Sequence, residues 1–170
     1  AAEIVVGSNG EEMYEVDNSG AARHINLMDG TVTSLGNVGV LANAMGLDYT
    51  TGIYYATDGN SLFTIDFEEV TSTNVGSLGS GAGNLMIGMT FDQDGNLYMY
   101  DIVIDQLWSC DKETGACTQI GSIGFDANFG QGMAWDQGLG MPVMSAFNNG
   151  AFACEYRTVD VTTGMSTFVG

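Results

Sequence analysis

Short runs of alternating apolar and polar residues recur along the whole chain, separated by turn-forming residues. Residues 62–65 (Leu-Phe-Thr-Ile) and 118–120 (Thr-Gln-Ile) alternate with a period of two, the pattern of a strand with one buried face. Between such runs lie dipeptides that tolerate positive φ in hairpins, such as Asp58-Gly59, Asp94-Gly95 and Asn149-Gly150. No long run with a period of 3.6 residues accompanies them. The pattern therefore predicts an all-β protein of short strands.

The strands belong to four tandem copies of one sequence unit. Each copy has an apolar residue, Asp or Asn, a polar turn, a Thr-rich strand, an apolar residue and a closing Gly. The copies align without gaps over residues 25–36, 65–76, 110–121 and 159–170. The closing glycines are 40 to 49 residues apart. Four-stranded antiparallel units at this spacing are typical of β-propeller blades, which bury their faces by stacking on one another.

A second pattern marks the first strand of each unit. Gly46-Leu-Asp-Tyr49, Gly88-Met-Thr-Phe91 and Gly132-Met-Ala-Trp135 all read Gly, large apolar, small or polar, aromatic. We therefore align these three segments with one another. The opening strand of the first copy, Ile4-Val5-Val6, matches this pattern poorly. The expected blades of this single domain cover, in order, residues 1–39, 40–79, 83–124 and 127–170.

The third copy resembles a known type of repeat. Residues 88–98 read GMTFDQDGNLY, and residues 107–121 read LWSCDKETGACTQIG. These segments resemble the repeats of secreted bacterial β-propeller proteins, which read approximately GLAFDPDGNLY…LYRIDPATGAATLIG. The resemblance extends over nearly the whole chain. It implies a β-propeller fold and secretion, but it implies no particular activity, because such propellers serve many roles.

Four copies are few, because repeats of this size usually close rings of about six to eight blades. The chain is therefore part of a longer protein, half of an eight-bladed ring completed by another chain, a tightly curved four-bladed ring, or an open stack. An open stack would leave strand edges exposed at both ends, and such edges recruit other chains. We expect self-association into an oligomer or a filament.

The charge of the chain restricts its partners. It has 21 acidic and 3 basic residues, with a formal net charge of −18. Such a surface repels nucleic acid and anionic membranes, so nucleic acid is excluded as a partner. No apolar run reaches the roughly 18 residues of a membrane span, so no membrane insertion is expected. The composition suits a protein outside cells, and Ala1-Ala2-Glu3 has the small residues found around a signal-peptidase site.

The three cysteines point to an oxidising compartment. Cys110 and Cys117 bracket a predicted hairpin turn, and facing positions on paired strands suit a disulfide. The alternative is two free thiols in a reduced cell. Cys154 is left over, and we expect it to be buried and inert.

One turn is a candidate metal site. Asp92, Asp94 and Asn96 place oxygen ligands at alternate positions, like the start of a calcium loop. Val103 stands where an EF-hand would have its acidic residue, so the EF-hand interpretation fails. The alternative is a plain hairpin turn, in which Asp, Gly and Asn are common. Calcium is the only cofactor that the sequence suggests.

Few residues suit catalysis. The chain has two arginines, whereas sialidase propellers hold a carboxylate with three, and His24 is its only histidine. No GxSxG motif is present, while paired-carboxylate glycosidase chemistry stays open because acids are plentiful. We identify no catalytic residues.

Aromatic residues recur at blade spacing: Tyr49, Tyr54, Phe91, Tyr98 and Trp135. We expect them to pack between blades, and the alternative is a sugar-binding surface. The chain is accordingly interpreted as a non-enzymatic, extracellular or cell-surface module with a structural or interaction role, whose partners are other protein chains, including itself. The alternatives are a carbohydrate-binding or carbohydrate-active propeller with glycan partners, and a calcium-stabilised adhesin-like domain.

Overall fold

A computed structural model of the chain describes residues 2–7, 10–79 and 85–170. Within these residues every regular element is a strand, and no helix is present that is long and apolar enough to cross a membrane. Sixteen strands form four antiparallel sheets of four consecutive strands, which we call blades 1 to 4. The predicted all-β fold of four β-propeller blades is confirmed. The blade limits expected at residues 1 and 83 lie outside the described residues.

Each blade is a simple up-and-down sheet. Blade 1 contains β1 (Ala2–Val6), β2 (Glu12–Asp17), β3 (Ala21–Asn26) and β4 (Val32–Asn37). Blade 2 contains β5 (Ala44–Asp48), β6 (Ile53–Thr57), β7 (Ser61–Asp66) and β8 (Thr71–Ser77). Blade 3 contains β9 (Met86–Phe91), β10 (Leu97–Asp101), β11 (Gln106–Cys110) and β12 (Cys117–Ser122). Blade 4 contains β13 (Ala127–Asp136), β14 (Met141–Asn148), β15 (Ala153–Val159) and β16 (Ser166–Phe168).

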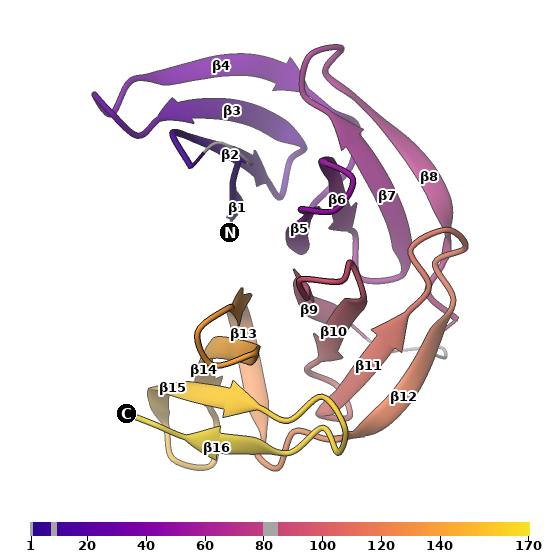
Figure 1. Cartoon of the computed structure of the whole chain (residues 1–170), viewed down its shortest axis with the longest axis vertical. Helices are drawn as coiled ribbons and strands as arrows, with labels where there is room; N and C mark the ends of the chain where they lie inside the picture. The colour runs from indigo at the N-terminus through magenta and orange to yellow at the C-terminus, as the bar shows by residue number, and fades with distance from the viewer. Residues whose placement is uncertain (1, 8–9, 80–84) are drawn as a thin grey trace.

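The blades follow one another in an arc, with the first strand of each blade near the centre and the fourth strand outside (Figure 1). The inner strands contact one another in chain order: β1 lies against β5, β5 against β9, and β9 against β13. Blades 1 and 4 are the two ends of the arc, which is open between them in Figure 1. Each end blade therefore packs one face against a neighbour, and its other face has no blade on it.

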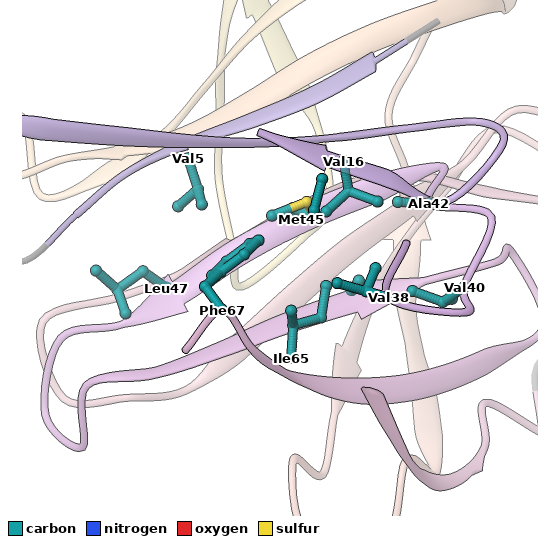
Figure 2. Packing of buried hydrophobic residues seen from close by; sticks show 11 residues of the cluster. Val5, Val16, Val38, Val40, Ala42, Met45, Leu47, Ile65 and Phe67 are labelled. Atoms are coloured by element: carbon teal, nitrogen blue, oxygen red, sulfur yellow. The ribbon is translucent and has the colours of Figure 1, made fainter. Parts of the chain in front are cut away.

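Apolar cores lie between successive blades. In Figure 2, Val5 and Val16 of blade 1 face Met45, Ile65 and Phe67 of blade 2. Each strand alternates, so one set of its side chains meets the preceding blade and the other set meets the following blade. Burying one large apolar side chain contributes about 1.5–3 kcal/mol, so the stacking of blades is what stabilises each thin sheet.

The two further cores repeat this arrangement. Between blades 2 and 3, Leu62 packs in one cluster with Met89 and Phe91. Between blades 3 and 4, Leu107 packs in one cluster with Met144. The three cores explain why the same apolar positions recur in each copy of the sequence unit.

The closing glycine of a blade packs against the turn between the third and fourth strands of the next blade. A Cβ atom on Gly76 would lie 2.1 Å from the carbonyl oxygen of Thr114 in blade 3. A Cβ atom on Gly121 would lie 2.2 Å from the carbonyl oxygen of Thr163 in blade 4. Contact between Cβ and backbone at these distances is impossible, so only glycine fits, and the repeated Gly is a requirement of blade stacking.

The inner strand of blade 2 is aligned two residues away from the position expected from the sequence. Asp48 and Asp136 end their inner strands and Asp92 directly follows β9, and each carboxylate accepts an amide N–H from the turn that comes next. Their equivalence places Ala44, rather than Gly46, at the position of the glycines that begin the pattern in blades 3 and 4. The expected alignment of Gly46 was therefore wrong. A shift of two residues keeps every side chain on its face, so the apolar pattern did not reveal it.

The disulfide prediction is confirmed, and the prediction for the third cysteine is wrong. Cys110 on β11 and Cys117 on β12 are paired across the hairpin and form a disulfide, with their Cα atoms 4.0 Å apart. Cys154 on β15 is a free, exposed cysteine rather than a buried one. It lies on the face of blade 4 that no blade covers, so a small apolar side chain there meets solvent.

Candidate interaction surfaces and axial pocket

The uncovered face of blade 1 carries exposed apolar side chains at positions whose equivalents in blade 2 are buried. Ile4 and Val6 on β1 correspond to Met45 and Leu47 on β5, by their pairing with the second strand. Ile4 is 53% exposed and Val6 39%, whereas Met45 is 6% and Leu47 3% exposed beneath blade 1. We call this surface the blade 1 end face, and it includes Ile4, Val6, Met13, Glu15, Asp17, Arg23, Ile25 and Val32.

An ion-pair cluster lies in the middle of the blade 1 end face. The Arg23 guanidinium donates to Glu15 at 2.9 Å and to Asp17 at 3.1 Å. Hydrogen bonds from Ser19, followed by those from Ala21 and Arg23, lower the pKa of Asp17 well below its ordinary value. One of the few basic residues of the chain therefore bridges the two carboxylates of this face.

The uncovered face of blade 4 shows the same effect at the opposite end. The backbone of Tyr156 on β15 hydrogen-bonds to the backbone of the closing Gly170. Tyr156 therefore holds the position that Leu62 and Leu107 hold relative to the closing glycines of blades 2 and 3. Leu62 and Leu107 are fully buried by the following blade, whereas Tyr156 is 43% exposed. We call this surface the blade 4 end face, and it includes Val143, Ser145, Phe147, Cys154, Tyr156 and Thr158. None of these six side chains is charged.

A strained aromatic cluster includes Phe147 of the blade 4 end face. The ring of Phe147 is 5.1 Å from that of Phe129 and 5.5 Å from that of Phe152, both at steep angles. Phe129 is 60% and Phe152 81% exposed, and both have positive φ, 64° and 52°. A bulky residue in this conformation costs of order 1–3 kcal/mol, and such strain is found at functional positions. The sequence offered no signal for this cluster beyond three phenylalanines.

The inner strands of all four blades surround an axial pocket of about 320 Å³. Its apolar lining includes Tyr49 and Trp135, and its polar lining includes Thr50, Gln93, Gln137 and Asp92, whose carboxylate disfavours an anionic ligand. The volume is at the lower end of the range for small-molecule sites, and the mixture of aromatic rings with amide and hydroxyl groups suits a neutral polar ligand.

Four of the five recurring aromatic residues pack between blades, as predicted. Tyr54 contacts an aromatic ring of blade 1, Phe91 contacts a ring of blade 2, and Tyr98 of blade 3 stacks on Trp135 of blade 4 with centroids 6.2 Å apart. Tyr49 differs, since it lies in the turn after β5 and is 54% exposed. The two-residue shift in blade 2 explains this difference, because Leu47 takes the buried position instead.

The candidate calcium residues form a hydrogen-bonded turn after β9. One oxygen of Asp92 accepts the amide N–H groups of Asp94 and Asn96, at 2.9 and 2.8 Å, and the other accepts the side-chain amide of Asn96 at 2.8 Å. In the described part of the chain, no three His, Cys, Asp or Glu side chains are grouped to hold a metal ion. A calcium ion here would have to replace these hydrogen bonds, and its binding stays a prediction that a melt with EDTA tests.

One ion pair connects two blades, and no sequence pattern predicts it beyond the fact that Lys112 is one of only 3 basic residues. Lys112, in the β11–β12 turn of blade 3, donates to the fully buried carboxylate of Asp48 in blade 2. Burial raises the pKa of Asp48, but hydrogen bonds from Lys112, Thr50 and Thr51 outweigh it and lower the pKa to about 2. This pair ties two blades together rather than forming a reactive site.

The fold is shared with solved β-propeller structures. A Bacteroides thetaiotaomicron protein of unknown function superposes with a TM-score of 0.72 at 15% identity, over 98% of this chain and 42% of that one. The hydrazine synthase of Kuenenia stuttgartiensis gives 0.66 at 12% identity, over 98% and 48%. An auxiliary nutrient binding protein from Bacteroides thetaiotaomicron gives 0.68 at 14% identity, over 96% and 40%. This chain thus spans less than half of each of these three chains.

Sequence comparison adds no family. No protein-family model matches the chain, and no curated protein sequence matches it. The structural neighbours include an enzyme as well as a binding protein, and identities this low show the fold alone. Function must therefore be argued from the surfaces and the pocket.

Proposed function

We propose that this chain is a non-enzymatic, extracellular interaction module that associates with other protein chains through its two end faces. The observation that carries the proposal is the exposure of side chains such as Tyr156 and Ile4, whose counterparts inside the arc are buried. Exposed apolar surface of this kind marks sites of protein association. The Cys110–Cys117 disulfide supports a location in an oxidising, extracellular environment.

Sedimentation velocity over a series from about 1 to 100 μM tests the association. We expect the wild type to form an oligomer or a filament, and we expect Tyr156→Glu to weaken it, since a charge would be buried in the contact. Val103→Glu is the control, because Val103 is 53% exposed in the β10–β11 turn of blade 3, which is at neither end of the arc. A wild type that stays monomeric throughout the series contradicts the proposal.

A second function, carbohydrate binding, is favoured by the axial pocket. Tyr49 offers an exposed aromatic face beside the amides of Gln93 and Gln137, and sugars bind by stacking and by hydrogen bonds. One structural neighbour is an auxiliary nutrient binding protein, which agrees with a binding role. A glycan array followed by calorimetry tests this function. Tyr49→Ala should weaken binding tenfold or more, about 1.4 kcal/mol, while Tyr156→Ala, outside the pocket, should leave it unchanged.

A further inference from the structure

We propose that the blade 4 end face of one copy docks on the blade 1 end face of a second copy, and that the two copies close a ring of eight blades. This inference rests on the proposed function and deepens it, because it names the partner and the surfaces that meet. The second copy would continue an interface that the chain already makes three times, between blades 1 and 2, 2 and 3, and 3 and 4.

The contact between closing glycine and turn is left half made at each end of the arc. Inside the arc, Gly76 meets the turn glycine Gly115 of the next blade, with the backbones in close contact. Gly170 closes blade 4 in the same way, but no atom lies within 4 Å of the position of its absent Cβ. Gly30 is the turn glycine of blade 1, with a φ of 75° like the 81° of Gly115, and it too has no such neighbour. The blade 4 end thus carries a closing glycine with no turn against it, and the blade 1 end carries a turn glycine with no closing glycine against it.

The outer strand of blade 1 begins with an exposed residue whose equivalent in blade 4 is buried. Val32, at the start of β4, holds the position of Cys117 on β12 and Ser166 on β16, by their pairing with the third strand. Ser166 is 7% exposed and donates its amide N–H to Ile123 of the preceding blade at 3.1 Å. Val32 is 58% exposed, because no blade precedes it. A docked blade 4 would cover it as blade 3 covers Ser166.

The charges on the two faces permit this docking despite the net charge of −18 on each copy. None of the six side chains that define the blade 4 end face is charged, and Glu15 and Asp17 on the blade 1 end face share the ion pairs of Arg23. Asp29, which precedes the turn glycine Gly30, and Asp136, at the end of β13, would also lie at the contact, and each carboxylate accepts an amide N–H group of its own turn.

The curvature of the arc is that of larger propellers. The four blades superpose with a TM-score of 0.72 on 42% of one longer chain and with 0.71 on 63% of another, so the arc bends as it does within longer propeller chains. A second arc of four blades would continue this curvature and bring the two pairs of end faces together. In this arrangement each copy offers one face of each kind, and a two-fold axis relates the two identical contacts.

A complementation experiment tests both the faces and their polarity. Val32→Glu disables the blade 1 end face, and Tyr156→Glu disables the blade 4 end face. Val103→Glu is the control, because Val103 is 53% exposed in the β10–β11 turn of blade 3. Native mass spectrometry and sedimentation should find the wild type and the control as two-chain species of about 36 kDa, twice the 17.9 kDa of one chain. Each end-face variant alone should be monomeric, since both of its contacts contain one disabled face.

Mixing the two end-face variants in equal amounts should restore a two-chain complex that contains one of each, because one of its two contacts is then wild type. If one variant alone still associates like the wild type, the faces meet like to like and the inference is wrong. Species longer than two chains would rule out the closed ring. If the wild type associates but the two variants do not restore a complex when mixed, only this inference is contradicted. If the wild type is monomeric, the proposed function is contradicted as well. If thermal melting shows that Tyr156→Glu is unfolded, Cys154→Glu, on the same face, replaces it in the experiment.

Discussion

At the scale of single residues, glycine decides how closely two blades approach. The turn position before each fourth strand has positive φ in all four blades: 75° at Gly30, 56° at Val70, 81° at Gly115 and 84° at Gly164. Blade 2 therefore holds a β-branched residue where the others have glycine, a conformation that is strained for valine. At Gly115 and Gly164 the preceding blade adds a second requirement, because its backbone occupies the space of a side chain.

Two alanine substitutions separate these requirements. Gly30→Ala should destabilise by about 1 kcal/mol, since it changes only the preference of the backbone. Gly115→Ala should cost about 3 kcal/mol, because its Cβ would lie 2.9 Å from the carbonyl oxygen of Gly76 and would push blades 2 and 3 apart. Urea unfolding at a concentration below self-association measures both. Equal losses would show that the close approach of the blades contributes nothing.

The Asp48–Lys112 pair makes stability depend on pH. The folded-state pKa of Asp48, about 2, lies below the value in an unfolded chain, so the stabilisation is complete above about pH 4 and is lost as the pH falls toward 2. Lys112→Met removes the hydrogen bond that lowers this pKa, and it should cost about 2 kcal/mol at pH 7. Unfolding free energies measured between pH 7 and pH 2 should converge for the two proteins at the acidic end. Parallel curves would show that the pair does not stabilise the fold.

At the scale of elements, the hairpin of third and fourth strands is the part of each blade that meets the closing glycine of the preceding blade. In blade 3 the Cys110–Cys117 disulfide closes this hairpin across seven positions of sequence. In the other blades hydrogen bonds alone hold the equivalent hairpin, as when Asp160 accepts from Thr162 in blade 4. The disulfide therefore reinforces one hairpin of an architecture that the others build without it.

Replacing both cysteines, as Cys110→Ser with Cys117→Ser, should lower the unfolding free energy by about 2 kcal/mol, as expected for a short closed loop. A reductant should lower the stability of the wild type by a similar amount and leave the double variant unchanged. Cys154→Ser is the matched control, because Cys154 is free, and it should not respond differently from the wild type. A wild type that is insensitive to reduction would contradict the prediction.

At the scale of the whole molecule, association has to overcome the repulsion between two acidic chains, each with a net charge of −18. The contact itself is apolar and internally paired, so salt screens the repulsion without weakening the contact. Raising sodium chloride from about 0.05 to 0.5 M should therefore strengthen association of the wild type several-fold. Sedimentation equilibrium measures the constant, and Tyr156→Glu should stay monomeric at both salt concentrations. Weaker association at high salt would show that ion pairs across the contact hold the copies together.

The sequence indicated more of the fold than of the candidate surfaces. The strands, the four repeats and the Cys110–Cys117 pair follow from local patterns, since period-two alternation and turn dipeptides act over a few residues. The position of Gly46 was misjudged because a shift of two residues leaves that alternation unchanged. The exposure of Cys154 was misjudged because whether a strand face is covered depends on a blade far away in the sequence.

By itself, the sequence of this protein determined the class of fold, the number of repeats and the acidic surface, because these depend on composition and on patterns within one blade. Only the tertiary structure decided that Tyr156 and Ile4 are exposed while their counterparts are buried, and that Gly170 and Gly30 lack the contact their counterparts make. The physical reason is that burial in a stack of sheets belongs to the pair of blades and not to either one. The end faces therefore become visible only when the order of the blades in space is known.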